Sequence, residues 1–353
     1  MDFEQYLIEQ LNKHPAMQPQ DLVKMCYQAA YGAEHLLADP HSAWIYLKKE
    51  YEQLEIVDTC PEKILYEEIS SQVCRIHLSA WKSKGLPLEW LHTMFVASCK
   101  GEENAQAQFT QYLETAGKIV REKNLGFTIH HWEEYCSDYK KRGMPPVHHS
   151  QEYREKEHPN YRIVHSHFCR ILPILELAKK YLQANTPCVI AIDGRAASGK
   201  TTLASLLKLV LHADIIHLDD FFLPPELRQK ERFQTPGGNI HHERFIQQVL
   251  PFLSQRTPFS YQIFDCSTMK YSGVQQIGTQ FFHVVEGSYS CHPFFGDYAD
   301  ITIFADVSSD EQEERIRQRN GEELLKMFVS RWIPLEESYF SHFQIKEKAQ
   351  LIL

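Results

Sequence analysis

A run of eight residues constrains the fold of this chain more than any other feature of its sequence. Residues 194–201 read GRAASGKT, which fits the pattern GxxxxGK[ST], and Thr202 follows. The apolar run Cys188–Asp193 precedes it, and the helical pattern Thr201–Leu211 comes after it. A strand, glycine loop and helix in this order can wrap a phosphate with backbone N–H groups at a helix N-terminus. The alternative is a plain glycine turn between a strand and a helix.

The second half of the chain alternates short apolar runs with amphipathic stretches, beginning at residue 188. The apolar runs that predict strands are Cys188–Asp193, Ile215–Leu218, Phe281–Val285, Ile301–Asp306 and Ala349–Leu353. Buried strands that alternate with helices indicate a parallel sheet with helices on both faces. We therefore predict an α/β phosphate-loop domain over residues 188–353.

The first half has a different pattern, with apolar residues at helical spacing and no sustained period-2 alternation. A chain of 353 residues is long enough for two domains. We predict a mainly α-helical domain over residues 1–183, joined to the second domain through Gln183–Pro187. Helices are expected at Asp21–Leu37, Pro61–Leu78, Leu88–Cys99 and Ile171–Tyr181, with an ordered loop or a short helix in Gly143–Tyr161.

Composition and charge exclude several classes of protein. The formal net charge is −9 and both halves are acidic, which disfavours nucleic-acid binding as the main role. The first ten residues are acidic rather than basic, and no apolar run approaches the length of a membrane span. Nine scattered cysteines without CxxC spacing are typical of reduced thiols. We expect a cytoplasmic protein that does not bind membranes.

The loop residues supply the groups that a bound nucleotide needs. Lys200 would reach the β- and γ-phosphates, and the Thr201 hydroxyl would hold Mg²⁺. The predicted nucleotide-binding residues are Gly194, Ala196, Ala197, Ser198, Gly199, Lys200, Thr201 and Thr202.

Carboxylates end two of the predicted strands. Asp219 and Asp220 follow the second strand, and Glu286 follows the third. The carboxyl ends of parallel strands line the ligand crevice of an open sheet. A carboxylate there can hold Mg²⁺ or accept a proton from an attacking hydroxyl. We predict that Thr201, Asp219 and Glu286 bind the metal; the alternative is polar strand ends that face water.

Arginines cluster near residue 317. Arg315 and Arg319 share a helical face by their i, i+4 spacing, while Arg317 points elsewhere. Arginines on a mobile segment above a nucleotide could neutralise charge on a transferred phosphoryl group. The alternative is a solvated helix with Glu–Arg pairs.

Taken in order, these motifs resemble the P-loop kinase group that contains uridine kinase, pantothenate kinase and phosphoribulokinase. The resemblance covers only the C-terminal half. The segments that carry it are IDGRAASGKTTLA (192–204), HLDDFF (217–222), PGGNIHHERF (236–245), VVEG (284–287), ADITIFADVSSDEQEERIRQR (299–319) and RWIPLEESYF (331–340).

The resemblance implies an ATP- and Mg²⁺-dependent phosphotransferase with an alcohol group as acceptor. The γ-phosphoryl group would pass to a hydroxyl of a nucleoside-like or other small metabolite. The base or metal-linked aspartate of the group falls on Asp219, its metal glutamate on Glu286, and its lid arginines within Arg315–Arg319. We therefore expect Lys200, Asp219, Arg315 and Arg319 to serve catalysis.

The acceptor pocket departs from the uridine kinase pattern. His241 and His242 stand where those enzymes carry a sugar-binding aspartate, and residues 264–270 differ from their pyrimidine-recognition stretch. The sequence thus indicates the reaction more firmly than the acceptor. Candidate acceptor-binding residues are Asp220, Arg232, His241, Tyr261 and Asp265.

The first half contains a histidine-rich segment, residues 130–167. These histidines could hold a metal, or His148, His149, Arg154 and Arg162 could form an anion site for a phosphorylated metabolite. Structural or solvated roles are the default. The first domain could be regulatory, dimer-forming or a second enzyme, which would make the chain bifunctional. The rival interpretation of the whole chain is an ATP-binding switch or ATPase.

Overall fold

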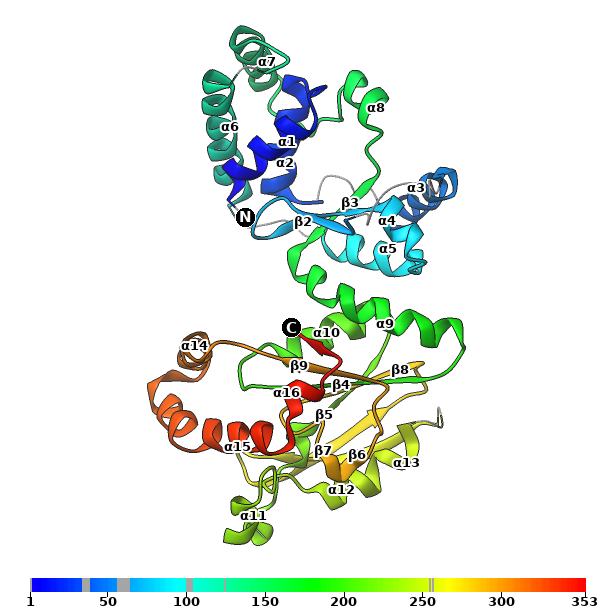
Figure 1. Cartoon of the computed structure of the whole chain (residues 1–353), viewed down its shortest axis with the longest axis vertical. Coiled ribbons are helices and arrows are strands. Elements are labelled where there is room, and N and C mark those ends of the chain that lie inside the picture. The colour runs from blue at the N-terminus through cyan, green and yellow to red at the C-terminus, as the bar shows by residue number, and fades with distance from the viewer. Residues whose placement is uncertain are drawn as a thin grey trace. The chain divides into compact units, whose positions relative to one another are not determined.

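The computed structural model of the chain describes residues 2–33, 39–55, 64–99, 104–123, 125–253, 255 and 257–353. Contacts divide the chain into two compact units, Met1–Cys169 and Arg170–Leu353, and each has its own core (Figure 1). Within the described ranges, no helix combines the length and the apolar character that crossing a membrane requires.

The first unit combines helices with a small sheet. Its helices are α1 (Phe3–Lys13), α2 (Pro19–Tyr31), α3 (Pro40–Gln53), α4 (Leu78–Ser83), α5 (Leu88–Ala97), α6 (Ala105–Glu122), α7 (Ile129–Lys141) and α8 (Gln151–Glu157). Its strands are β1 (Tyr66–Glu68), β2 (Val73–His77) and β3 (Tyr161–His165), paired antiparallel in the order β1-β2-β3.

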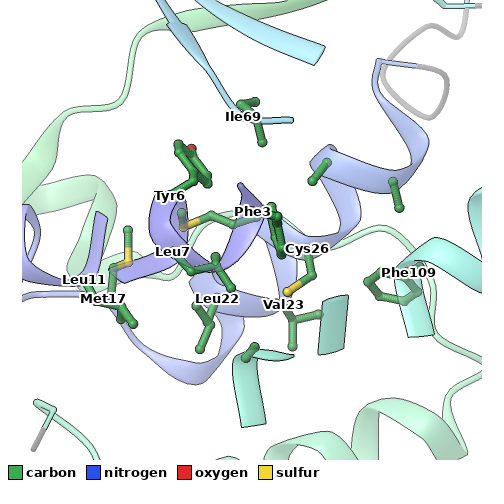
Figure 2. Packing of buried hydrophobic residues seen from close by; sticks show 14 of the residues in the cluster. Phe3, Tyr6, Leu7, Leu11, Met17, Leu22, Val23, Cys26, Ile69 and Phe109 are labelled. Carbon is green, nitrogen blue, oxygen red and sulfur yellow. The ribbon is translucent and has the colours of Figure 1, made fainter. Parts of the chain in front are cut away.

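Helix α2 lies at the centre of the first unit. It starts at Pro19, where the Asp21 carboxylate accepts from the backbone N–H of Gln18 at 3.0 Å. It packs against α6 and α7, and Figure 2 shows Leu22, Val23 and Cys26 among the apolar side chains of this core. The helix stops at Gly32, which has a φ of 56°. The predicted helix Asp21–Leu37 is thus correct up to Tyr31, and residues 34–38 lie outside the described ones.

The prediction of a helix over Pro61–Leu78 is wrong. Residues 66–77 form the hairpin of β1 and β2, and residues 61–63 lie outside the described ones. Four successive residues of β2, Val73–Ile76, are buried, so both faces of the strand are covered. A strand covered on both faces lacks the alternation of apolar and polar residues that would identify it in the sequence. The other helix predictions hold as α5 and α9, and the short helix expected within Gly143–Tyr161 is α8.

The division between the units falls one helix earlier than the predicted boundary at residues 183–187. Helix α9 (Leu172–Gln183) belongs to the second unit, because its apolar side packs near β9 of that unit's sheet. At its end, the Tyr181 hydroxyl donates to the carbonyl oxygen of Asp300 at 3.2 Å.

The second unit is built on a five-stranded parallel sheet in the order β10-β9-β4-β8-β5. All five predicted strands are present. Their bounds are β4 (Cys188–Gly194), β5 (Asp214–His217), β8 (Phe282–Glu286), β9 (Ile301–Ala305) and β10 (Leu351–Ile352). Helices lie on both faces, as expected for an α/β domain (Figure 1).

The remaining elements of this unit follow the strands. The helices are α10 (Lys200–Leu211), α11 (Lys230–Gln234), α12 (His242–Gln248), α13 (Leu250–Leu253), α14 (Ser309–Met327), α15 (Ile333–Phe343) and α16 (Ile345–Lys348). Between β5 and β8 the chain also forms an antiparallel hairpin of β6 (Phe259–Asp265) and β7 (Lys270–Ile277).

The topology places the glycine loop at a switch point of the sheet. The next strand of this sheet after β4 is β5, at one edge, whereas the next strand after its neighbour β9 is β10, at the other edge, so the chain leaves β4 and β9 in opposite directions. Helix α10 covers one face against β4, β5 and β8. On the other face Val189 and Val285 pack with Phe245 of α12 and Phe340 of α15. The loop after β4 is therefore held between two packed layers.

Gly194 has no room for a side chain. A Cβ atom there would lie 2.1 Å from the carbonyl oxygen of Ala305 in the paired strand β9, and the φ of Gly194 is 133°. We expect Gly194→Ala to lower the free energy of unfolding by about 2 kcal/mol or more, because backbone strain adds to the collision. Urea or thermal unfolding of the full chain measures this loss.

Gly273→Ala is the matched control. Gly273 lies in β7, has an ordinary φ, and an added Cβ would meet nothing within 4 Å. Its unfolding midpoint should stay near that of the wild type. Equal midpoints for both alanine variants would contradict the close packing at Gly194.

Candidate active site

The loop between β4 and α10 turns sharply at two glycines. The φ angles are 133° at Gly194 and 94° at Gly199, and residues with side chains rarely adopt either. The Lys200 ammonium folds back over the loop and donates to the carbonyl oxygens of Gly194 and Arg195, both at 2.8 Å. The backbone thus makes the tight turn that a phosphate-binding loop needs, and the Lys200 side chain lies against the loop backbone.

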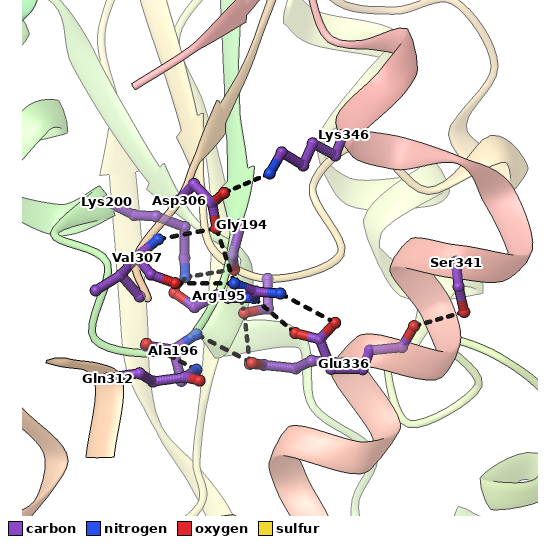
Figure 3. Close-up of polar contacts among 12 residues, drawn as sticks. Gly194, Arg195, Ala196, Lys200, Asp306, Val307, Gln312, Glu336, Ser341 and Lys346 are labelled. Carbon is purple, nitrogen blue, oxygen red and sulfur yellow. Dashed lines mark hydrogen bonds and ion pairs between the residues drawn. The ribbon is translucent and has the colours of Figure 1, made fainter. Parts of the chain in front are cut away.

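Side chains of α15 anchor this loop (Figure 3). The backbone N–H of Ala196 donates to Glu336 Oε2 at 3.0 Å, and the Ser288 hydroxyl donates to Glu336 Oε1 at 2.7 Å. Burial raises the pKa of Glu336. Arg195 forms an ion pair with Glu337 at 2.7 Å. The backbone amide of Ala196 is therefore bound to a carboxylate of the protein, Glu336.

A buried aspartate joins the loop to the segment after β8. Asp193 accepts from the backbone N–H groups of Gly194 at 2.7 Å, Tyr289 at 3.0 Å and Cys291 at 2.9 Å. The Tyr339 hydroxyl also donates to it, at 2.8 Å. Burial raises the pKa of Asp193, and these donors oppose the rise. Sequence reasoning missed this role, although an aspartate at the end of an apolar strand and next to the loop glycine was a usable signal.

The predicted metal residues meet at the carboxyl ends of the strands. The Thr201 hydroxyl lies 3.3 Å from each carboxylate oxygen of Glu286, the last residue of β8. His217, which ends β5, places its Nδ1 atom 2.6 Å from Glu286 Oε1. This hydrogen bond raises the pKa of His217, whereas burial opposes the rise. Sequence reasoning did not select His217, although it is the first residue of the motif HLDDFF that contains Asp219.

Asp219 lies in the 3₁₀ turn Leu218–Phe221 that follows β5. Burial raises the pKa of this carboxyl group, the negative charge of Glu286 raises it further, and Lys200 opposes the rise. A carboxylate with a raised pKa is a stronger base. Asp219 is thus a carboxylate that is exposed to the cavity and lies near both the lysine and the glutamate of the site.

These groups line one cavity of about 810 Å³. Of the predicted residues, those that line it are Ala196, Ala197, Gly199, Lys200, Thr201, Thr202, Asp219, Glu286, Arg315 and Arg319. Gly194 and Ser198 belong to the same loop but are not part of the lining. A cavity of this size accommodates a small ligand.

The two arginines reach the cavity from α14. Arg315 donates to the carbonyl oxygen of Ala197 at 3.1 Å, and the side chain of Arg319 donates to Asn320 at 2.7 Å. Helix α14 is broken at Gly321, which has a φ of 81°. Arg317 instead forms ion pairs with exposed glutamates and does not line the cavity, in agreement with the predicted helical face.

The five candidate acceptor residues do not line this cavity. Asp220 accepts from the Tyr261 hydroxyl at 3.0 Å, so these two side chains bond to each other. Arg232 pairs with Glu243 at 2.9 Å, and His241 caps α12 by accepting from a backbone N–H. Asp265 accepts from Ser267 and Thr268 in the turn between β6 and β7. Asp265 itself does not line the cavity, but the next two residues, Cys266 and Ser267, do.

Other residues complete the wall, and sequence reasoning missed them. They include Arg170, Phe222, Arg228, Asn239, Cys266, Ser267, Ser288, Tyr289, Phe328 and Trp332. Asn239 and Trp332 belong to the quoted motifs PGGNIHHERF and RWIPLEESYF, so the motifs pointed to the right segments. Arg170 has no such signal, because it precedes the strand and loop by more than fifteen residues.

The residues present fit a nucleotide with Mg²⁺. The hydroxyl of Ser198 is buried in the loop and makes no hydrogen bond within the described part of the chain, so an unused donor lies between two loop residues that line the cavity, Ala197 and Gly199. In these same ranges, no group of three His, Cys, Asp or Glu side chains is placed to hold a metal alone. Mg²⁺ in phosphoryl-transfer sites usually takes only one or two carboxylates and completes its shell with phosphates and water.

Two solved structures illustrate what the chain is similar to, whereas no family model and no curated protein matches it. One is provisionally described as a possible uridine kinase from Bacillus stearothermophilus. It has 17% identity and a TM-score of 0.39, and the match covers 52% of this chain and 100% of that chain. The other, provisionally described as a fructose transport system kinase from Silicibacter sp. TM1040, has 20% identity and a TM-score of 0.41, with 50% and 98% covered. Each match covers about half of this chain, and neither assigns it a reaction.

Proposed function

We propose that the unit Arg170–Leu353 is an ATP- and Mg²⁺-dependent kinase that phosphorylates a hydroxyl group of a small molecule. The observation that carries this proposal is that the phosphate loop, Asp219, Glu286 and two arginines of α14 line one cavity of about 810 Å³. Phosphoryl transfer needs little covalent chemistry from the protein and depends on positioning and charge stabilisation. The cavity offers groups for both positioning and charge stabilisation.

The loop side of the cavity suits a nucleotide. Lys200 now donates to two loop carbonyls, and its ammonium could turn from them to phosphate oxygens. Thr201 and Glu286, 3.3 Å apart, would hold Mg²⁺, with Asp219 beside them. The bound metal would neutralise charge on the phosphates. His217 fixes the orientation of Glu286 through its 2.6 Å hydrogen bond.

Asp219 is the residue best suited to take the proton from the acceptor hydroxyl. It lines the cavity, and its raised pKa makes it a stronger base than an aspartate with an ordinary pKa. A general base must lie within hydrogen-bond reach of the proton that it removes. We assign the acceptor hydroxyl to the part of the cavity next to Asp219, Arg228 and Ser267.

The arginine side of the cavity would stabilise the transferred group. Arg315 and Arg319 lie on α14, and the break at Gly321 separates the part of the helix that carries them from its last residues. Phe328 and Trp332 add apolar surface to the same wall. Closure of this segment would bring positive charge to the phosphoryl group and exclude water, which limits wasteful hydrolysis of ATP.

The test is a screen of small metabolites that carry hydroxyl groups, with the purified full chain, ATP and Mg²⁺. We expect at least one compound to raise ADP release above the basal rate and to gain one phosphoryl group by mass spectrometry. ADP release that no compound raises would overturn the kinase proposal and would favour a nucleotide-dependent switch instead.

A further inference from the structure

A second cavity of about 680 Å³ lies within the first unit. We call it the Lys24 pocket. Its lining comes from α2, α3, the segment that leads into α8, α8 itself and the start of β3. The four residues that the sequence suggested as an anion site, His148, His149, Arg154 and Arg162, all belong to this lining. Segments distant in the sequence thus converge on one cavity, which is large enough for a small metabolite.

Lys24 is the unusual residue of this pocket, because it is a buried cation. Only 7% of the residue is exposed, and the one hydrogen bond it makes within the described residues goes to the carbonyl oxygen of Val147, at 3.1 Å. An ammonium group has three N–H donors, so two remain for a ligand. A buried charge without enough partners is costly, and an anion in the pocket would relieve that cost.

Two arginines add to the positive charge of the pocket. Arg162 is largely buried and pairs with Glu50 at 2.8 Å, although a guanidinium offers five donors. Arg154 is exposed at the rim and has no side-chain partner within the described ranges. Among the lining residues, these three basic side chains are accompanied by one acidic side chain, Glu50, which leaves two positive charges in surplus. The nearby Asp21 carboxylate is outside the lining and accepts hydrogen bonds from other groups. This surplus lies in a chain whose net charge is −9.

A chain of hydrogen bonds fixes the polar wall behind these cations. Asp21 Oδ1 lies 2.9 Å from His149 Nδ1, and His149 Nε2 lies 2.6 Å from the Tyr161 hydroxyl. Burial lowers the pKa of His149 to about 4, so the neutral ring donates from Nδ1 to the carboxylate and accepts at Nε2. Gln28 also donates to the Tyr161 oxygen, at 3.1 Å. The wall is therefore ordered before any ligand binds, which lowers the cost of binding.

We propose that the Lys24 pocket binds a small molecule that carries a phosphate monoester. A phosphate monoester bears nearly two negative charges at neutral pH, which match the surplus of two positive charges. A single carboxylate would leave one of these charges uncompensated. Lys24 would meet the phosphate inside the pocket, and Arg162 and Arg154 would contact it from the side and the rim. This proposal does not depend on the activity of the second unit.

The test measures binding of inorganic phosphate to the full chain by calorimetry, in a Lys200→Ala background that weakens the phosphate loop of the second unit. We expect Lys24→Met to weaken phosphate binding by roughly tenfold or more, because it removes a charge-assisted hydrogen bond. Arg154→Gln should weaken it by about threefold, since this arginine is exposed. Lys48→Met, at an exposed lysine of α3 outside the lining, is the matched control and should bind phosphate normally.

Arg154→Gln also protects the test against misfolding, because its side chain makes no bond that the fold needs within the described residues. Unchanged phosphate affinity in both Lys24→Met and Arg154→Gln would overturn the proposal. A panel of small phosphate monoesters and carboxylates then tests the ligand class. At least one monoester should bind more tightly than inorganic phosphate, and tighter binding of a carboxylate would contradict the assignment.

Sulfate provides a pH test, because it stays a dianion throughout the range of interest. Burial and the nearby Arg75 lower the pKa of Lys24 to about 8, and Asp21 acts in the opposite direction. An ammonium attracts an anion only while it is protonated. Sulfate affinity should therefore be full near neutral pH and fall as the pH rises through about 8, and Lys24→Met should lose this dependence. The other charged or titratable groups that line the pocket are Tyr46, Glu50, His148, His149, Arg154, His158, Tyr161 and Arg162.

Discussion

Lys200→Ala should abolish phosphoryl transfer to the limit of detection, a loss of roughly a thousandfold or more. The ammonium belongs to the loop cation that lines the cavity, and it donates to the carbonyl oxygens of Gly194 and Arg195. Alanine removes the charge and leaves the loop backbone in place. ADP release with the best acceptor from the metabolite screen measures the effect.

Lys208→Ala is the matched control, because Lys208 is exposed on the same helix, α10, and does not line the cavity. This variant should transfer phosphoryl groups at the wild-type rate. Thermal unfolding of both variants distinguishes a lost catalytic group from a lost fold. Substantial turnover by a folded Lys200→Ala protein would remove Lys200 from the proposed role.

Asp219→Asn should retain nucleotide binding and lose most turnover, by roughly 10²- to 10⁴-fold. The amide has almost the same shape as the carboxyl group but cannot take a proton. Asp219 lies near Glu286 and Lys200, so the substitution also removes one negative charge from a crowded site. Turnover with the best acceptor and nucleotide affinity, measured on the same preparation, separate the two effects.

Asp214→Asn serves as the control for Asp219→Asn. Asp214 lies at the other end of the same strand, β5, where it accepts from the backbone N–H of Gly278 at 2.9 Å. Its replacement removes an equal charge far along the strand from the cavity, and turnover should stay near normal. Near-normal turnover in Asp219→Asn as well would show that this carboxylate is not the base.

The phosphate loop and the parallel sheet of the second unit could be predicted because their signals are local. Glycine spacing specifies a sharp turn at Gly194 and Gly199, and buried strands appear as short apolar runs in the sequence. The carboxylates at strand ends were predictable for the same reason, since parallel strands direct their carboxyl ends to one edge. Asp219 and Glu286 accordingly line the same cavity.

The acceptor side of the cavity could not be predicted in the same way. Asp220 and Tyr261 are both polar and close to the motif, but their side chains bond to each other rather than line the cavity. Which of two neighbouring aspartates faces the cavity depends on the 3₁₀ turn after β5. In the first unit, the sequence pattern predicts a helix where the structure has β2, because both faces of this strand are covered and its apolar residues do not alternate with polar ones.

The sequence by itself determined the phosphate loop, the order of strands and helices around it, and the residues that its motifs carry to the cavity. These features depend on residues that are close together along the chain. Only the tertiary structure decided which distant residues come together: Asp193 bonds to Tyr339 in the second unit, and Lys24 and Arg162 line the same cavity in the first. The physical reason is that burial and charge pairing depend on packing, and packing brings together segments that no local pattern relates.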